Sequence, residues 1–127
     1  MRYALIPDPS QRCSGCNGGL AVYADKATPN GGFGADTTTD DIIHELPESA
    51  TDPDLSAWFT RSGEENGNLC DYVYGTTQTG VSSIGATYHY NAALPTISRA
   101  SRPYLIQQIW KKLRRGVLRI QLIALPT

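Results

Sequence analysis

The sequence has little charge and no long apolar run. Charged residues make up 18% of its 127 residues, and the mean hydropathy is −0.31. Its apolar stretches fall far short of the roughly 20 residues that a bilayer-spanning helix needs, so we expect no transmembrane segment. Hydrophobic residues still make up 40% of the chain, which argues against disorder, and the length fits one domain with one core.

Acidic residues are missing from the C-terminal part of the chain, and basic residues are scarce in its middle. Ten of the twelve acidic residues lie between Asp36 and Asp71, where Arg61 is the only base. After Asp71 there are no acids, and seven bases lie between Arg99 and Arg119. The acidic middle suggests affinity for cations, whereas the basic end suggests either anionic partners or a solvated tail, and we favour the tail. We expect a monomer with no nucleic-acid partner.

Cysteine is scarce as well, with Cys13, Cys16 and Cys70 as the three examples. No second Cys-x-x-Cys is present, so a loop disulfide between Cys13 and Cys16 is favoured over a zinc knuckle or a redox pair. That pairing would leave Cys70 outside the disulfide. The first residues also contain no apolar secretory segment, so we expect the sequence to be truncated at both ends.

Twelve glycines and eight prolines favour short strands joined by loops over a helical bundle. The clearest helix is predicted over residues 38–50, with Asp40 in its first turn, caps among residues 37–39, and Pro53 as its stop. Ile42, Ile43 and Leu46 would form its apolar side. The predicted strands cover residues 3–6, 20–24, 72–74, 86–90 and 103–110. The sequence therefore predicts a single α+β domain, with one acidic central helix on a mostly antiparallel sheet.

His44, Glu45 and Glu48 form the pattern with the clearest chemistry. In zincin metalloproteases, a His-Glu-x-x-His helix places two metal ligands four residues apart, and the intervening glutamate is the general base. Here Glu48 stands where the second histidine would be. The candidates for a third ligand are Asp54, Glu64 and Glu65. Such a set suits Zn²⁺, with Mn²⁺ or Ca²⁺ as alternatives.

Other observations favour a plainer interpretation. Pro47 lies between the two candidate ligands, where a helix-interior proline costs about 3 kcal/mol and could misplace Glu48. An acidic helix also commonly turns its charges toward water. The second histidine, His89, alternates with two tyrosines, which is typical of a strand surface. The tyrosines and tryptophans could form a sugar-stacking face or the core, and we favour the core.

Several short motifs follow one another in the middle and later parts of the chain. They are Thr28-Pro29-Asn30-Gly31 through Gly34-Ala35-Asp36, His44-Glu45-Leu46 with Glu48, TDPDLSAWF at residues 51–59, GEENGNLC at residues 63–70, and YLIQQIW at residues 104–110. Together they resemble the secreted EXORDIUM or phosphate-induced protein family, especially its fungal and microbial members. The resemblance runs from about residue 3 to residue 110.

This resemblance implies an extracellular or cell-wall protein with disulfides, related to growth responses and without an established catalytic activity. A cell-wall component or another secreted protein would be its partner. The resemblance also implies a zincin-derived metal site, with His44, Glu48 and Glu65 as ligands and Glu45 as the base of a metallopeptidase-like reaction. The alternative function is a secreted zinc-dependent endopeptidase, and the third is a carbohydrate-binding module.

The chain departs from the family pattern at several positions. Asn68 stands where family members usually carry aspartate, and Pro47 replaces a helix-compatible residue. Family members continue to a short glycine-rich end with a final cysteine, whereas this chain continues as KKLRRG at residues 111–116. We therefore expect a partial family domain over residues 1–110 and a poorly ordered basic tail over residues 111–127, produced by an error in the gene model.

Overall fold

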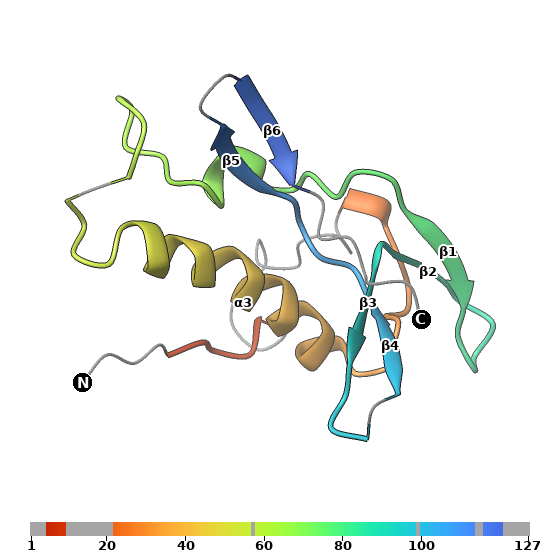
Figure 1. The fold of residues 1–127 in the computed structure, drawn as a ribbon. Coiled ribbons are helices and arrows are strands. Elements are labelled where there is room, and N and C mark those ends of the chain that lie inside the picture. Colours follow the sequence, from red (N-terminus) through yellow and green to blue (C-terminus); the bar gives the residue numbers. More distant parts are fainter. Residues whose placement is uncertain (1–4, 10–21, 57, 99, 114–115, 121–127) are drawn as a thin grey trace.

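The computed structural model describes residues 5–9, 22–56, 58–98, 100–113 and 116–120. Its largest element is the long helix α3 (Phe33–Thr51), beside which lie three short pairs of antiparallel strands (Figure 1). The predicted α+β class is therefore confirmed. In the described part of the chain, no helix is long and apolar enough to cross a membrane.

Helix α3 begins five residues earlier than predicted. Gly32 is the N-cap residue, and the predicted caps lie inside the helix. There, the Thr37 hydroxyl donates to the Phe33 carbonyl at 2.8 Å, and the Thr39 hydroxyl donates to the Ala35 carbonyl at 2.9 Å. These bonds to the preceding turn let threonine occupy a helix interior. The predicted end is confirmed, because α3 stops at Thr51, and Pro47 lies within the helix.

The strands form three separate two-stranded sheets in place of the single predicted sheet. The strand β1 (Gln78–Val81) pairs with β2 (Thr87–Tyr90), β3 (Ala92–Pro95) pairs with β4 (Ser101–Tyr104), and β5 (Ile109–Leu113) pairs with β6 (Gly116–Ile120). A tight turn joins β1 to β2, where Gly85 has a φ of 78° that favours glycine. Short connections of this kind explain why each pair is a local hairpin.

Strand prediction was right for β2 and only partly right elsewhere. Residues 103–110 contain the end of β4 and the start of β5, with a break between them. Residues 72–74 are not a strand, because Tyr72 has a φ of 59°, outside the extended region. Leu5 and Ile6 are also not in a strand, and Val22 and Tyr23 are helical. Ala24 is a turn residue with a φ of 54°, and residues 3, 4, 20 and 21 lie outside the described part.

The side chains that α3 buries are mainly polar. At four-residue intervals the helix and its C-cap carry Asp36, Asp40, His44, Glu48 and Asp52, which we call the acidic row. Its four acids are only 5–7% exposed. An ionised group can be buried in this way only when hydrogen bonds replace its water. The acidic row is therefore the part of α3 that needs partners from the rest of the chain.

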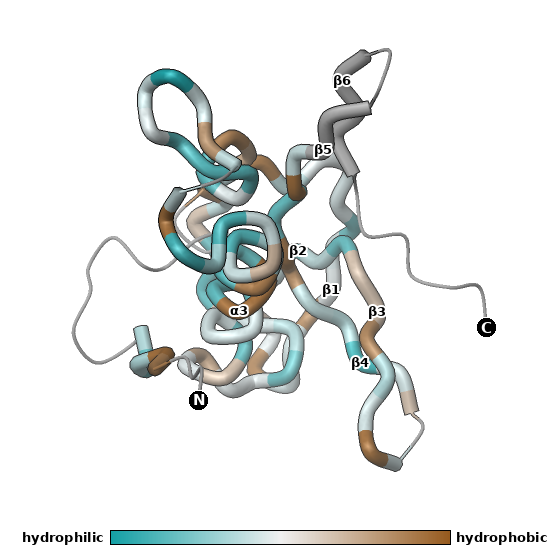
Figure 2. The backbone as a smooth tube through the Cα atoms, turned by 60° about the vertical axis from the view of Figure 1, so that its left-hand side comes forward, coloured by the Kyte–Doolittle hydropathy of each residue, from teal (hydrophilic) through white to brown (hydrophobic). Residues whose placement is uncertain are grey.

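The apolar side of α3 faces outward instead of forming the core. Ile42 is 40% exposed and Leu46 is 63% exposed, whereas Ile43 is half-buried, so two of the three residues predicted to form the apolar side lie outside the core. Residues of both kinds are distributed around the helix (Figure 2). The periodicity located an amphipathic helix correctly, but it did not show which side the fold would cover.

The apolar core of the described residues is small. It consists of Cys70, Tyr74, Ala92 and Ile106, each at most 4% exposed. Asn91 ties the segments around it together, since its amide nitrogen donates to the carbonyls of Tyr74 and Ile106 at 2.7 and 2.6 Å. Its amide oxygen accepts from the Ile106 backbone N–H at 3.0 Å. Hydrogen bonds of one partly buried side chain thus hold together segments that a larger apolar core would otherwise join.

The C-terminal residues include the β5–β6 hairpin. The predicted boundary at residue 110 falls inside β5, and β6 lies within the stretch predicted as a tail. The division into a domain and a poorly ordered tail stays a prediction, as does the Cys13–Cys16 disulfide, since both cysteines lie outside the described residues. Cys70 is buried and is the last residue of the 3₁₀ turn η1 (Asn68–Cys70).

Candidate metal centre on helix α3

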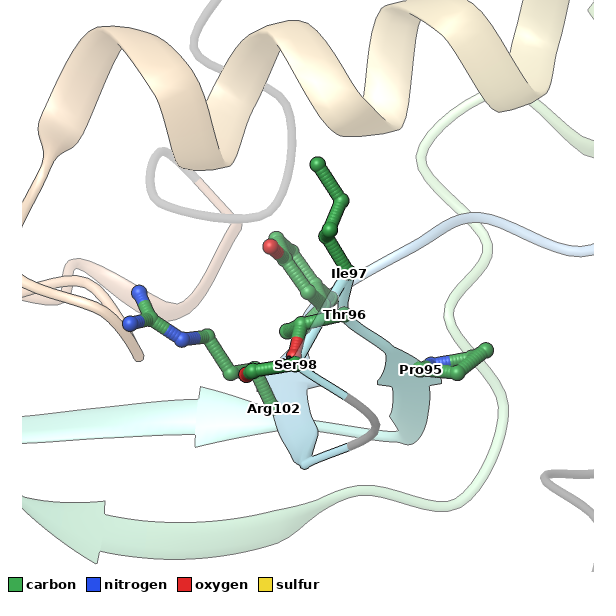
Figure 3. A pocket seen from close by; sticks show the side chains of 6 residues that line it. Pro95, Thr96, Ile97, Ser98 and Arg102 are labelled. Atoms are coloured by element: carbon green, nitrogen blue, oxygen red, sulfur yellow. Dashed lines mark hydrogen bonds between the residues drawn. The ribbon is translucent and has the colours of Figure 1, made fainter.

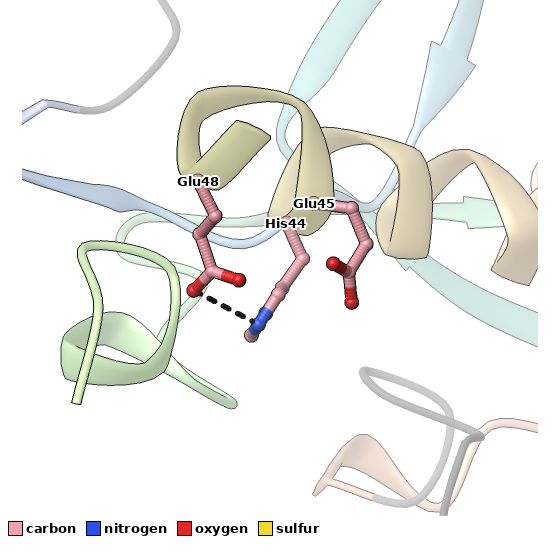
Figure 4. Close-up of side chains that lie close together, drawn as sticks. All are labelled: His44, Glu45 and Glu48. Atoms are coloured by element: carbon pink, nitrogen blue, oxygen red, sulfur yellow. Dashed lines mark ion pairs between the residues drawn. The ribbon is translucent and has the colours of Figure 1, made fainter. Parts of the chain in front are cut away.

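Helix α3 brings His44, Glu45 and Glu48 together at one place (Figure 4). One potential ligand atom from each side chain lies within 4.8 Å of the others. Residues four apart are neighbours on a helix surface. The His44 Nε2 atom accordingly lies 3.4 Å from Glu48 Oε1. An imidazole nitrogen beside two carboxylates is a donor set that suits Zn²⁺ or Mn²⁺.

The loop before η1 fixes the carboxylate of Glu48. Backbone N–H groups of Gly67 and Asn68 both donate to Glu48 Oε1, at 3.1 and 3.2 Å. The carbonyl of Gly67 in turn accepts a 3.2 Å bond from the Gln107 side-chain amide. Asn66 is joined to the start of β5 because its carbonyl accepts from the Trp110 N–H at 3.1 Å. Glu48 is therefore an oriented, buried carboxylate whose position depends on two later segments of the chain.

Asn68 and Glu48 both lie against the same ring nitrogen of His44. The Asn68 Oδ1 atom accepts a 3.0 Å bond from the Glu65 backbone N–H, so its Nδ2 group is the one that faces His44. That Nδ2 group lies 3.3 Å from His44 Nε2. An amide N–H₂ group only donates, so it pairs with Nε2 in the tautomer that carries its proton on Nδ1, whereas the Glu48 carboxylate beside the same nitrogen only accepts and pairs with a protonated Nε2. A metal ion on Nε2 requires the tautomer that carries its proton on Nδ1.

Gly67 leaves no space for a larger residue between the loop and the helix. A Cβ atom at this position would lie 2.6 Å from Glu48 Oε1 and 3.0 Å from His44 Cδ2. Its φ of −69° is ordinary for any residue, so the requirement for glycine is steric and not conformational. The loop backbone can approach the two candidate ligands only because this residue has no side chain.

Glu65, the predicted third ligand, lies near this group but not within it. Its pKa is raised by partial desolvation first, and then by the carboxylates of Glu48 and Asp52. The contributions of Glu48 and Asp52 to the pKa of Glu65 show that negative charge accumulates around the site. Among the described residues, the group of ligand atoms within 4.8 Å contains His44, Glu45 and Glu48 without a further acid.

The alternative third ligands are also outside that group. Asp54 is exposed in the turn after α3. Glu64 is exposed in its own loop, where its backbone N–H donates to the Thr60 hydroxyl at 3.0 Å and its carboxylate accepts from Ser62 at 3.4 Å. Neither side chain belongs to the group of ligand atoms around His44 in the described part of the chain. Glu65 does not belong to it either, but the charges of Glu48, Glu45 and His44 affect its pKa.

Asp40 lies one helical turn before His44, and the sequence predicted it in the first turn of the helix but not as part of the site. The Tyr74 hydroxyl donates to Asp40 Oδ2 at 2.7 Å, and the Gln107 backbone N–H donates to Oδ1 at 2.6 Å. Burial nevertheless raises the pKa of Asp40 to about 6, with a smaller contribution in the same direction from Asp41. Burial and the Asp40 carboxylate together raise the pKa of the Tyr74 phenol. The four-residue spacing of the acidic row was the signal that could have identified Asp40.

His89 belongs to a different contact. Its Nδ1 lies 2.9 Å from Asp25 Oδ1, and its backbone N–H donates to Asp25 Oδ2 at 2.7 Å. The ring stacks on Tyr23, with centroids 4.2 Å apart. His89 was predicted to be an ordinary residue on a strand surface. It is a partly buried residue of β2 that anchors this strand to the segment around Asp25.

The fold and the site define this chain as a small α+β domain with a histidine and two glutamates grouped on a helix. The chain is similar to Protein EXORDIUM-like 3 of Arabidopsis thaliana, with 30% identity over an alignment of 119 residues. The alignment covers 85% of this chain and 35% of that protein, so the chain spans about a third of the length of the curated relative it matches. This similarity loosely supports a relation between this chain and the EXORDIUM family. No family profile and no solved structure matches the chain.

Proposed function

We propose that this chain is part of an extracellular EXORDIUM-family protein, and that His44, Glu48 and Glu65 bind one divalent metal ion, preferably Zn²⁺. The observation that carries the metal proposal is the arrangement of His44 and Glu48. The Nε2 atom of His44 lies 3.4 Å from Glu48 Oε1, and this carboxylate oxygen accepts from two backbone N–H groups. Oriented ligands of this kind need little rearrangement to bind an ion.

The charge around the site supports the same proposal. Glu45 and Glu48 lie within one ligand group, and the carboxylates of Glu48, Asp52 and Glu45 raise the pKa of Glu65. A divalent cation among these acids would relieve their repulsion and lower the pKa of Glu65 again. To reach the ion, Glu65 would rotate toward His44, and the Asn68 amide would release Nε2.

Calorimetric titration with Zn²⁺, Mn²⁺ and Ca²⁺ tests the proposal. We expect one ion per chain, with His44→Ala and Glu48→Gln each weakening binding by about a hundredfold or more, since removing even an outer-shell partner costs 10–100-fold. His89→Ala is the matched control, because His89 is the second histidine of the chain and lies in a different contact. Equal Zn²⁺ affinity in the wild type and in His44→Ala would overturn the proposal. Binding should also weaken in acid, because a protonated imidazole cannot be a ligand.

A zinc-dependent endopeptidase is the second candidate function, and the position of Glu45 favours it. Glu45 belongs to the ligand group and follows His44 as the general base follows the first ligand in zincins. Glu45→Gln should leave Zn²⁺ binding nearly unchanged and abolish any cleavage of a protein substrate. Cleavage that persists in Glu45→Gln would exclude this role.

Similarity to an EXORDIUM-like protein supports a location outside the cell and a growth-related role in or near the cell wall. Fractionation of the source cells, followed by detection with an antibody against this chain, tests the location. We expect the protein in the wall or the medium. A protein confined to the soluble cell interior would contradict this part of the proposal.

A further inference from the structure

A hollow at the outer end of the β3–β4 hairpin is separate from the metal centre (Figure 3). It is a shallow hollow of about 570 Å³ that is open to solvent over most of its boundary. Six side chains line it: one is cationic, two carry a hydroxyl group and three have apolar surface. They are Arg102, Thr96, Ser98, Pro95, Ile97 and Tyr104.

The positive charge in this hollow is available to a ligand. Arg102 is exposed on β4. Among the described residues, the ion pair of His44 with Glu48 and that of His89 with Asp25 do not involve this guanidinium. A guanidinium has five N–H donors in a planar fork and can bind a carboxylate or a phosphate through two parallel hydrogen bonds. The charge therefore selects for an anionic group.

The two hydroxyl groups add a requirement for hydrogen-bond donors on the ligand. The Thr96 hydroxyl donates to the Ala100 carbonyl at 2.8 Å, so in the 2.9 Å contact between the two hydroxyls Ser98 is the donor. Each hydroxyl has only one proton, and both are then used within the hairpin. What the exposed Ser98 oxygen offers to a ligand is an acceptor, which matches a hydroxyl group and not a second anion.

The remaining walls are apolar and lie on both sides of these polar groups. Ile97 is fully exposed at the tip of the hairpin, and Tyr104 is partly exposed on β4. Aromatic rings pack well against the C–H faces of flat, hydroxylated rings while their hydroxyl groups remain in water. A ligand with an anionic group, hydroxyl groups and an apolar ring face is a sugar acid or a sugar phosphate.

The base of the hairpin holds these side chains in a fixed place. The Asn91 N–H donates to the Tyr104 carbonyl at 3.0 Å, and the Asn30 side chain donates to the Pro103 carbonyl at 2.8 Å. Arg102 and Tyr104 therefore lie on either side of a residue that is bonded to the segment before α3. Binding sites on anchored elements lose less entropy when a ligand binds.

We propose that the tip of the β3–β4 hairpin binds an anionic sugar, a pyranose that carries a carboxylate or a phosphate group. Arg102 pairs with the anion, Ser98 accepts from a sugar hydroxyl, and Tyr104 with Ile97 covers one face of the ring. This site does not use the metal centre, and it can bind its ligand while a chelator is present.

The test is calorimetric or NMR titration of the whole chain, in the presence of a chelator, with galacturonate, glucose 6-phosphate and glucose. We expect saturable binding of at least one anionic sugar in the millimolar range or tighter, and at least about tenfold weaker binding of glucose. Arg102→Gln should weaken anion binding about tenfold or more, as expected for a lost charge-assisted pair. The tighter of the two anionic sugars identifies the carboxylate or the phosphate as the recognised group.

Two further variants distinguish loss of the site from loss of the fold. Ile97→Ser changes a fully exposed side chain, so the chain should fold normally and bind the anionic sugar several-fold more weakly. Arg61→Gln is the matched control, since it removes an exposed arginine from another loop and should leave binding unchanged. Equal affinity for glucose and both anionic sugars, no saturable binding by the wild type, or an unchanged affinity in Arg102→Gln would each overturn the proposal.

Discussion

Acidification from about pH 7 toward pH 4 should stabilise this protein, because Asp40 takes up a proton more readily in the folded chain than in the unfolded chain. Burial raises the pKa of Asp40 from its ordinary value of 3.8 to about 6. Between these two values the folded state binds more protons than the unfolded state, so stability falls as the pH rises. The stabilising contribution is complete below about pH 3.8 and is lost as the pH passes through about 6.

The size of this effect follows from the two pKa values. Raising the pKa of one carboxyl group from 3.8 to about 6 corresponds to roughly 3 kcal/mol of unfolding free energy. The hydrogen bonds from Tyr74 and Gln107 favour the ionised form but do not offset the desolvation. The pKa values of Asp41 and Glu65 are also raised, so these groups add to the wild-type pH dependence in the same direction.

Asp40→Asn isolates the contribution of this one residue. An asparagine can accept from the Gln107 N–H with its oxygen and donate to the Tyr74 oxygen with its nitrogen, so it resembles the protonated acid. Urea unfolding followed by tryptophan fluorescence at several pH values is the assay. At pH 7 the variant should be more stable than the wild type by up to about 3 kcal/mol, and near pH 4 the two should differ little.

The control for this experiment is Asp36→Asn, which removes another buried carboxylate of the acidic row. Asp36 accepts from the backbone and side-chain nitrogens of Asn30 at 2.9 and 2.7 Å. Its replacement should destabilise the protein without removing the pH dependence, because Asp40 is still present. The reasoning would be refuted if Asp40→Asn kept the wild-type pH dependence, or if it were markedly less stable than the wild type at pH 7.

Three substitutions test other parts of the structure. Gly67→Ala should weaken Zn²⁺ binding and lower the free energy of unfolding by one to several kcal/mol each, because the new Cβ would contact Glu48. Gly32→Ala is the control, since a Cβ has space there and should have a small effect on unfolding curves. Asn68→Asp should tighten Zn²⁺ binding by about tenfold or more in calorimetry, since it replaces a competing N–H donor by a carboxylate; weaker binding would contradict this. Leu46→Gln should change the unfolding free energy by less than about 0.5 kcal/mol because Leu46 is 63% exposed, and a loss above 2 kcal/mol would show that it is buried.

Local signals in the sequence were sufficient for part of the fold. The α+β class, the long acidic helix and the strand at residues 87–90 follow from periodicity, proline and glycine positions, and β-branched or aromatic residues. The strands β1 and β3 were missed because residues such as Gly80, Ala92 and Ala93 have little intrinsic preference for a strand. Pairing with β2 and β4 supplies what their own composition lacks.

The candidate site shows a similar limit. The spacing of His44 and Glu48 predicted their proximity, because four residues along a helix always bring two side chains together. Gly67 and Asn68 could not be placed from spacing alone, since their contacts with α3 join residues about 20 positions apart. Burial of Asp40 was hidden for the same reason, because its partners Tyr74 and Gln107 follow much later in the chain.

The outward position of the apolar side of α3 has a physical explanation in the partners of the acidic row. Asp36, Asp40 and Glu48 each accept two hydrogen bonds, from the segment before the helix, from residues 74 and 107, and from the loop at residues 67–68.

Hydrogen bonds to charged groups are worth more than neutral ones and depend strictly on geometry. Turning Ile42 and Leu46 inward would bury some apolar surface but would break several of these bonds and leave their donors unsatisfied. The helix is therefore held by its acids, and the proposed metal ligands His44 and Glu48 belong to the same row of side chains. A cation at His44 and Glu48 would add a ligand bond at the middle of that row, so metal binding should increase protection of the whole helix against unfolding.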